Sequence, residues 1–271
     1  MILAIDTGGT KTLIALITER GEIKNRLRFP TPSSTVDYVK TLKETVAQNF
    51  KSHSISQVVV ALPGIIDDNG VARWCNNLGW RDFDAAKELA GICGDAPVHI
   101  ENDANLGGLG EARRVSPIPK SALYVTVSTG IGTGIISDGH IDPALSKSEG
   151  GRMLVEFDGL VREWESFASG RAIHDAYGKF ARDIHSRRAW NQIADRISRG
   201  FLAVIPLVQP DVIIIGGSIG TYFGRFAPQL ESLLIEKLPP HIPCPPIEQA
   251  ADPEEAVIYG CYYYARDLSV K

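Results

Sequence analysis

Short apolar runs rich in β-branched residues alternate along the first part of the chain with segments of helical period. Glycine-containing turns separate the first three runs, which predicts a β-meander at the start of the chain. The later runs are almost entirely apolar, as is typical of strands covered on both faces of a sheet. The strands expected here are Ile2–Ile5, Thr12–Thr18, Glu22–Phe29, Val58–Leu62 and Val98–Ile100, and the helices are Val36–Phe50, Phe83–Ile92 and Ala104–Arg113.

The same layout of strand, glycine turn and strand returns after the Pro-rich segment Ser116–Pro119, although few residues are shared. Mixed strands and helices, many of them fully apolar, indicate an α/β chain with two covered sheets and a cleft between them. The strands expected in this second part are Ala122–Val127, Gly132–Ser137 and Val212–Ile215, and the helices are Trp164–Ile184, Asn191–Leu207, Tyr222–Leu238 and Glu254–Arg266.

Composition narrows the class of protein further. The 271 residues are 44% hydrophobic and carry a formal charge of -4, which excludes a largely disordered chain and gives no general reason to expect nucleic acid as a partner. The four cysteines form no CxxC pair, which argues against a thiolate zinc site and suits a reducing compartment. Since the longest apolar stretch, Phe201–Ile215, contains two prolines and Asp211, we expect no membrane span and a cytoplasmic protein.

Three glycine-rich turns follow expected strands. Glycine lets the backbone approach a ligand closely and direct several N–H groups at phosphate oxygens. One such turn alone would be an ordinary hairpin, whereas three, two of them rich in Thr, favour phosphate binding. A carboxylate beside such a turn would repel phosphate unless a cation lies between them, so Asp6 indicates Mg²⁺. The three turns are Asp6–Lys11, Ser128–Gly134 and Gly216–Ser218.

Two other motif interpretations of these turns fit less well. Gly130–Gly134 is one residue short of GxGxxG and joins two expected strands, which disfavours a dinucleotide fold. Gly216–Gly220 matches the GxSxG nucleophile elbow, but a hydrolase needs an acid and then a histidine downstream. Only His241 follows Ser218, so the chain order does not support a hydrolase.

An acidic and amide-rich segment, Glu101–Asn105, lies where an apolar strand ends and a helix begins. A carboxylate at the C-terminal end of a strand lies where open sheets bind ligands. Asp103 or Asn102 is equally well placed to cap the helix. From the residues alone, a ligand-binding role and a capping role for Asp103 both stay open.

With these motifs assembled, the chain resembles the ROK family of sugar kinases, within the actin/hexokinase/Hsp70 ATPase superfamily. Each motif alone is modest, but eight of them occur in the family's order over nearly the whole chain. They are Asp6–Lys11, Pro63-Gly64, Asn76–Trp80, Asn102–Asn105, Ser128–Gly134, Glu149–Arg152, Trp164–Ile173 and Ile214–Ser218.

The resemblance implies a two-lobed actin-like ATPase (RNase H-like) fold, with mixed sheets flanked by helices and a central cleft. Residues 1–113 would form the N-terminal lobe, completed by a C-terminal helix over 254–271, and residues 114–253 the C-terminal lobe. The implied activity is ATP-dependent phosphorylation of a hexose hydroxyl, most simply the 6-position, with Asp103 as the base that accepts the hydroxyl proton. Small-molecule sugar and ATP are then the partners, with Mg²⁺ as cofactor and a homodimer as the family's tendency.

The resemblance also assigns the remaining site residues. The sugar would be held by Asn102, Glu149, Glu165, Arg152, Asn77 and Gly64. ATP would be held by Asp6, Gly8, Gly9, Thr10, Lys11, Thr129, Gly130, Gly132, Thr133, Gly216 and Gly217, with Asp6 also binding the Mg²⁺.

Two departures from the family pattern affect the expected sugar site. The family commonly carries a cysteine-rich zinc loop before its second sugar-binding Glu, but residues 154–163 contain no cysteine, so we expect no zinc site and packing by Phe157, Trp164 and Phe167 in its place. The family histidine is Arg152 here, a permanent cation that only donates hydrogen bonds. Arg152 would either contact substrate or form an ion pair with Glu149 or Glu156.

Other functions remain open at this stage. Some relatives of this fold are sugar-binding regulators with an N-terminal helix-turn-helix domain, for which the phosphate loop beginning at Asp6 leaves no room in this sequence. A kinase for fructose, for an N-acetylated hexosamine or for another acceptor also fits the motifs. Neither the sugar nor the preference for ATP over another phosphoryl donor follows from the residues.

Overall fold

The computed structural model describes residues 1–253 and 255–270, and the chain divides into two compact units. The first unit comprises Met1–Gly110 and the C-terminal segment from Val257 onward, and the second comprises Glu111–Ala256. The expected lobes, 1–113 completed by 254–271 and 114–253, stay predictions. Glu254 and Lys271, which the sequence assigns to the last helix, lie outside the described residues.

The first unit is built on a five-stranded sheet with the order β3-β2-β1-β4-β8. The three N-terminal strands form the expected antiparallel meander, and β4 and β8 continue the sheet in parallel. The apolar runs therefore predicted these strands correctly. Their bounds are β1 Ile2–Thr7, β2 Lys11–Ile17, β3 Ile23–Pro30, β4 Gln57–Leu62 and β8 Val98–Asn102.

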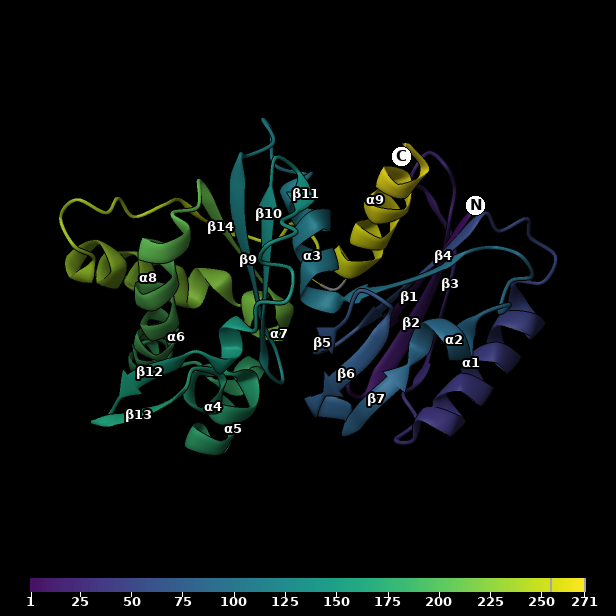
Figure 1. Cartoon of the computed structure of the whole chain (residues 1–271). Helices are drawn as coiled ribbons and strands as arrows, with labels where there is room; N and C mark the ends of the chain where they lie inside the picture. The colour runs from purple at the N-terminus through teal and green to yellow at the C-terminus, as the bar shows by residue number, and fades with distance from the viewer. Residues whose placement is uncertain (254, 271) are drawn as a thin grey trace. The chain divides into compact units, whose positions relative to one another are not determined.

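Helices cover both faces of this sheet (Figure 1). On one face α1 (Thr35–Asn49) packs Tyr38, Leu42 and Val46 into the core around the sheet, and Ser34 caps its first turn. On the other face lie α3 (Asp103–Ala112) and α9 (Ala256–Val270). Gly260 of α9 meets the backbone oxygen of Leu106 so closely that no Cβ would fit, so the two helices pack backbone to backbone.

A small three-stranded sheet that the sequence did not predict follows β4. It contains β5 (Ile65–Ile66), β6 (Val71–Cys75) and β7 (Trp80–Asp84), with a 3₁₀ turn at Asn76–Leu78. The predicted helix over Phe83–Ile92 is wrong at both ends. Phe83 pairs with Ala72 in the β6–β7 ladder, and α2 spans only Ala85–Leu89.

The second unit repeats the construction of the first. Its sheet has the order β11-β10-β9-β14-β15, again three antiparallel strands followed by two parallel ones. The repeated strand and glycine pattern is thus confirmed as a repeated sheet topology. The bounds are β9 Ser121–Val127, β10 Ile131–Ser137, β11 His140–Ile141, β14 Val212–Gly216 and β15 Ile247–Gln249.

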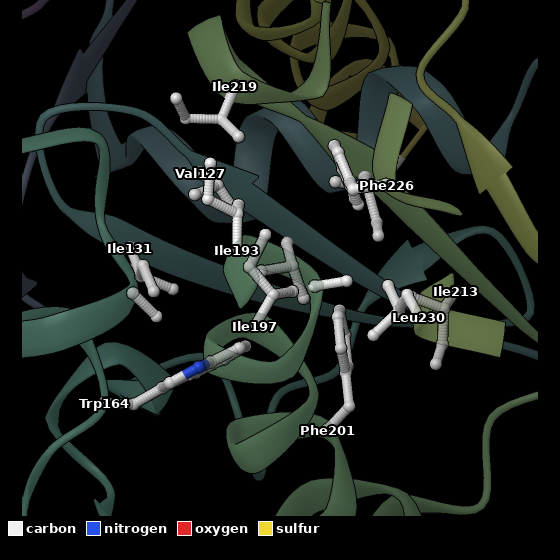
Figure 2. Packing of buried hydrophobic residues seen from close by; sticks show 14 of the residues in the cluster. Val127, Ile131, Trp164, Ile193, Ile197, Phe201, Ile213, Ile219, Phe226 and Leu230 are labelled. Carbon is white, nitrogen blue, oxygen red and sulfur yellow. The ribbon is translucent and has the colours of Figure 1, made fainter. Parts of the chain in front are cut away.

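The core of the second unit lies between this sheet and two long helices, α6 (Arg187–Val208) and α8 (Phe223–Lys237). Figure 2 shows Ile193, Ile197 and Phe201 of α6 among side chains from the sheet and from α8. Trp164 is fully buried and lies against Gly200, where α6 has no side chain in the way. This packing anchors the segment that carries the expected sugar-binding residues.

The predicted helix Trp164–Ile184 is broken into α4 (Glu165–Ala168), α5 (Gly170–Tyr177) and a 3₁₀ turn at Ala181–Asp183. The break has a tertiary cause, because the Gly170 N–H donates to the Ser128 backbone oxygen at 2.7 Å and Ser169 caps α5. A hairpin that the sequence also missed, β12 (Leu154–Phe157) and β13 (Leu160–Glu163), precedes it. A 3₁₀ turn, η2 (Gly150–Arg152), leads into the hairpin, and α7 (Gly217–Gly220) follows β14.

Candidate functional site

The turn between β1 and β2 is held in one conformation by three hydrogen bonds. The Gly8 N–H donates to the Lys11 oxygen at 3.0 Å, and Thr31 donates its hydroxyl to the Gly8 oxygen and its N–H to the Thr10 oxygen. Gly9, Thr10 and Lys11 are exposed. A fixed turn with exposed backbone and a lysine is chemically suited to phosphate oxygens. A Cβ on Gly9 would lie 3.4 Å from that of Asn77, so the structure brings Asn77 to this turn.

Two carboxyl groups of the first unit have perturbed acidity. Burial, and then the charge of Asp103, raises the pKa of Asp6 to about 7, although Lys11 and Arg28 oppose the shift. Burial also raises the pKa of Asp103 to about 6, against the effect of its hydrogen bond from the Ala104 N–H. Asp6 is the last residue but one of β1, and Asp103 begins α3, so both lie near element ends. Carboxyl groups that titrate near neutral pH are suited to proton transfer.

The structure decides which residue caps α3. Asn102 Oδ1 accepts the Asn105 N–H at 3.0 Å, so Asn102 is the capping side chain. Its amide Nδ2 donates to the Gly64 oxygen at 2.8 Å. This hydrogen bond joins Asn102 and Gly64, two of the residues expected to bind sugar. Gly64 has φ +93°, and a Cβ there would overlap the Trp74 oxygen, so only glycine fits. Asp103 Oδ1 accepts the adjacent Ala104 N–H at 2.8 Å, and the cap does not depend on Asp103.

In the second unit the β9–β10 turn is tied to the segment around Glu149. The Ser128 N–H donates to the Gly130 oxygen, which closes the turn and leaves Thr129 exposed. Thr133 is buried, and its hydroxyl oxygen accepts the Gly150 N–H at 3.0 Å. Thr133, which the sequence predicts to contact phosphate, therefore already has a hydrogen-bond partner in the second unit. Thr129 carries the more accessible hydroxyl of the two.

Arg152 lies between two glutamates. Its Nη1 is 2.6 Å from Glu163 Oε2, and its Nη2 is 3.1 Å from Glu165 Oε1. Burial alone would lower the pKa of Arg152, but Glu163, Glu165 and Glu149 together raise it. Of the two ion-pair partners expected from the sequence, Glu149 acts on Arg152 electrostatically, whereas Glu156 lies 3.6 Å from Arg199. The partners Glu163, which ends β13, and Glu165, which follows it, were missed because only the β12–β13 hairpin brings them back to Arg152.

A pocket of about 450 Å³ opens beside the β9–β10 turn of the second unit. The expected site residue Thr129 lines it, together with Ser128 and Ser218, whereas Gly216 and Gly217 are buried directly behind Ser218. Gly217 has φ +80°, and a Cβ there would lie 2.5 Å from the Val127 oxygen, so the turn needs glycine. The sequence assigned none of the remaining wall to the site, although Gly170 and Arg171 lie in the Trp164–Ile173 motif and Ile219 lies in Gly216–Gly220. This wall consists of Gly170, Arg171, His174, Phe180, Ala181, Arg182, Ile219 and Tyr222.

Within residues 1–253 and 255–270 no three His, Cys, Asp or Glu side chains are grouped to hold a metal ion. A Mg²⁺ carried by ATP needs only one or two protein carboxylates beside phosphate and water ligands, and Asp6 next to the β1–β2 turn fits that requirement. Where the family has its zinc loop, Phe157 stacks on Phe167 at 4.5 Å between ring centroids, and Trp164 is buried. The expected aromatic packing is therefore confirmed.

The expected site residues thus gather into two groups, each described within its own unit. In the first unit the structure brings together the Gly8–Lys11 turn, Asn77, Gly64, Asn102 and the two aspartates. In the second it brings together the β9–β10 turn, Glu149, Arg152 and Glu165.

None of the helices in the described part of the chain is both long and apolar enough to traverse a lipid bilayer.

Duplicated five-stranded sheets with glycine turns after β1, β9 and β14 define the actin-like ATPase class of fold. The chain belongs to the ROK family, because the family model described as "ROK family" matches residues 2–267. An N-acetylmannosamine kinase of Escherichia coli is 30% identical over 253 residues, covering 83% of this chain and 85% of that protein. A putative fructokinase of Bacillus subtilis is 28% identical, covering 81% of this chain and 77% of that one.

Solved structures show the same fold. A ROK family glucokinase from Streptomyces griseus, in complex with glucose and AMPPNP, matches with a TM-score of 0.84 at 22% identity, covering 98% of this chain and 99% of that one. An inorganic polyphosphate/ATP-glucomannokinase from Arthrobacter matches with a TM-score of 0.78 at 26% identity, covering 98% of both chains. The fold class and the family expected from the sequence are confirmed.

Proposed function

We propose that the protein is an ATP-dependent sugar kinase that transfers the γ-phosphoryl group to a hexose hydroxyl, most simply the 6-hydroxyl. The observation that carries the proposal is the Asp103 carboxyl at the start of α3, with its pKa raised to about 6, in the same unit as the Gly8–Lys11 turn. Membership of the ROK family and the kinase names of its relatives support it.

Asp103 is the proposed proton acceptor. Phosphoryl transfer depends mainly on positioning and on charge stabilisation, and a base that removes the hydroxyl proton typically contributes ~10²–10⁴-fold. Because Asn102 caps α3, the Asp103 carboxylate keeps acceptor capacity for a substrate hydroxyl. The Asn102 amide is held by the Gly64 oxygen and so is fixed next to this base.

The sugar hydroxyls are proposed to bind around Asp103 and around the Glu149–Glu165 segment. Ionised carboxylates accept hydrogen bonds strongly, so Glu149 and Glu165 suit hydroxyl donors, whereas the Asn102 amide both donates and accepts. Asn77 and Gly64 complete the proposed acceptor site in the first unit, and Arg152 contributes through its ion pairs in the second.

The phosphates of ATP are proposed to bind to Gly8, Gly9, Thr10, Lys11, Thr129, Gly130, Gly132 and Thr133. When bound at Asp6, Mg²⁺ would neutralise phosphate charge and orient the γ-phosphoryl group. Adenosine is proposed to lie against Gly216 and Gly217, in the 450 Å³ pocket whose wall includes His174 and Phe180. The centroids of these two rings are 4.7 Å apart, and Phe180 is 57% exposed, so an aromatic surface is accessible to a purine beside the Arg182 guanidinium, which lies over the Phe180 ring.

The test is a coupled assay with purified protein, ATP·Mg²⁺ and a panel of glucose, fructose, mannose, N-acetylmannosamine and N-acetylglucosamine. At least one sugar should be turned over, and the phosphorylated position should be assigned by NMR of the product. A second donor series with inorganic polyphosphate determines whether ATP is preferred.

The matched variant is Asp103→Asn, which keeps the shape of the side chain and removes the base. We expect kcat to fall by roughly 10²–10⁴-fold while the circular dichroism spectrum and ATP binding stay unchanged. Turnover of Asp103→Asn at the wild-type rate would refute the assignment of the base.

A sugar-binding regulator is the second candidate, because a ROK family transcriptional regulator shares the fold with a TM-score of 0.78 at 19% identity. A DNA-binding assay over a range of salt concentrations separates the two functions, since a DNA-binding protein that neutralises phosphates would show an affinity that falls steeply with salt. We further propose a cytoplasmic location and a homodimer with no nucleic-acid or membrane partner, to be tested by fractionation and by light scattering.

A further inference from the structure

The carboxylate of Glu165 is held at both oxygens. Its Oε1 lies 3.1 Å from Arg152 Nη2, and its Oε2 accepts the Ile131 N–H of the β9–β10 turn at 3.0 Å. The Glu165 side chain is only 18% exposed, less than that of Glu163 at 43%. A carboxylate with so little access to water depends on hydrogen-bond donors and cations of the protein as partners.

Two glycines bring Arg152 to this carboxylate. A Cβ on Gly150 would clash with Thr133, and one on Gly151 would overlap the Ile131 oxygen, so η2 lies directly on β10. The same residue, Ile131, donates its N–H to Glu165. The Arg152 side chain therefore starts next to β10, the strand whose Ile131 N–H binds the second oxygen of Glu165.

Arg152 is itself fixed on both sides. Its Nη1 contacts Glu163 at 2.6 Å while its Nη2 contacts Glu165, so the guanidinium bridges the end of β13 and the first residue of α4. The planar fork of an arginine can make both contacts at once, whereas the single ammonium of a lysine cannot reproduce that geometry.

We propose that Arg152 is a positioning residue for sugar binding: by bridging Glu163 and Glu165 it holds the Glu165 carboxylate in place as an acceptor for a hydroxyl of the sugar. This inference rests on the proposed function, in which Glu165 binds sugar. Each Glu165 oxygen retains a lone pair for a hydroxyl donor, because each accepts one contact from the protein.

The experiment compares sugar binding with turnover in four proteins: wild type, Arg152→Met, Arg152→Lys and the control Arg199→Met. Arg199 matches Arg152 in exposure, 28% against 33%, and also pairs with two carboxylates, Asp195 and Glu156, neither of which is assigned to the site. Affinity for each sugar of the panel is measured by calorimetry without nucleotide, and KM and kcat are measured with ATP·Mg²⁺.

We expect Arg152→Met to weaken sugar binding roughly ten- to a hundredfold, as loss of a charge-assisted contact does, with the KM for ATP changed by less than about twofold. Arg152→Lys should recover part of the affinity, and Arg199→Met should bind sugar as the wild type does. Equal losses in Arg152→Met and Arg199→Met, or no loss in Arg152→Met, would overturn the proposal.

A double-mutant cycle with Glu165→Gln tests whether Arg152 acts through Glu165. If it does, adding Arg152→Met to Glu165→Gln weakens sugar binding little further. If the two side chains act independently, the losses of affinity in the single variants multiply in the double variant, and that result would contradict the proposal. A wild-type protein that binds a sugar without phosphorylating it would refute the kinase function and leave this inference standing. A wild-type protein that binds no sugar of the panel would overturn the inference.

Discussion

The Asp6 and Asp103 carboxyl groups repel each other within the first unit, although they belong to β1 and α3, which are far apart in the chain. Burial is the larger cause of the raised pKa of Asp6, and the charge of Asp103 is the second. The two groups titrate near pH 7 and pH 6, so the charge of this region changes between about pH 5 and pH 8. Two predictions depend on that change.

The first prediction concerns the pH dependence of catalysis. Asp103 accepts a proton only when ionised, so kcat/KM should fall as the pH decreases through about 6, approaching tenfold per pH unit. The measurement is a profile of kcat/KM from pH 5 to 8 with the best sugar of the panel. Recovery of activity on return to pH 7.5 is the control for unfolding, and a flat profile down to pH 5 would contradict the role of Asp103.

The second prediction concerns the stability of Asp6→Asn. The folded-state pKa of Asp6, about 7, lies above the ordinary value of 3.8, so the folded protein retains a proton that the unfolded chain has lost. The contribution of Asp6 to stability therefore decreases as the pH rises from about 4 to 7. At pH 8 without Mg²⁺, Asp6→Asn should be more stable by about 1–2 kcal/mol, or roughly 2–8 °C in Tm.

The control for this prediction is the same comparison at pH 5, where the folded protein keeps Asp6 protonated but the unfolded chain is already ionised, so the difference should fall to about a third of its value at pH 8. Thermal unfolding followed by circular dichroism at both pH values gives the two differences. A variant less stable than the wild type at pH 8 would contradict this prediction, because it would show that the surroundings of the Asp6 carboxylate stabilise its charge more than burial destabilises it.

The third prediction concerns the side chain that caps α3. Asn102→Ala removes the cap of the Asn105 N–H and the contact with the Gly64 oxygen, so it should cost about 1–3 kcal/mol and also raise the KM for sugar. Ser34→Ala is the matched control, because it removes the cap of α1 and leaves the site intact. Chemical denaturation and sugar kinetics are measured for both variants. A sugar KM raised equally in both would point to a general loss of stability.

The fourth prediction separates backbone strain from close packing at Gly217. Gly217→Ala combines a positive φ with a Cβ only 2.5 Å from the Val127 oxygen, whereas Gly159→Ala has a similar φ of +75° and open space around it. Gly159→Ala should cost about 1–2 kcal/mol from strain alone, and Gly217→Ala should cost distinctly more and weaken ATP binding. The readouts are the free energy of unfolding and the KM for ATP. Equal costs in the two variants would mean that the turn relaxes around the new methyl group.

Local patterns predicted the elements whose formation depends on neighbours in sequence. The apolar runs at β1, β4 and β14 and the helical period of α1 are properties of consecutive residues, so they could be recognised directly. The β12–β13 hairpin is short, and only Phe157 of its strands is buried, so it lacks such a signal. The helix expected over Trp164–Ile184 is broken where Gly170 binds Ser128, a contact that no local pattern contains.

The sequence by itself determined where the glycine turns follow strands, that the chain resembles the ROK family, and that no thiolate metal site can exist in residues 154–163. Tertiary structure alone decided that Asn102 caps α3, and that Arg152 contacts Glu163 and Glu165. The physical reason is that composition and period belong to adjacent residues. The partners of a buried charge are chosen by distances that exist only once strands, turns and helices have packed.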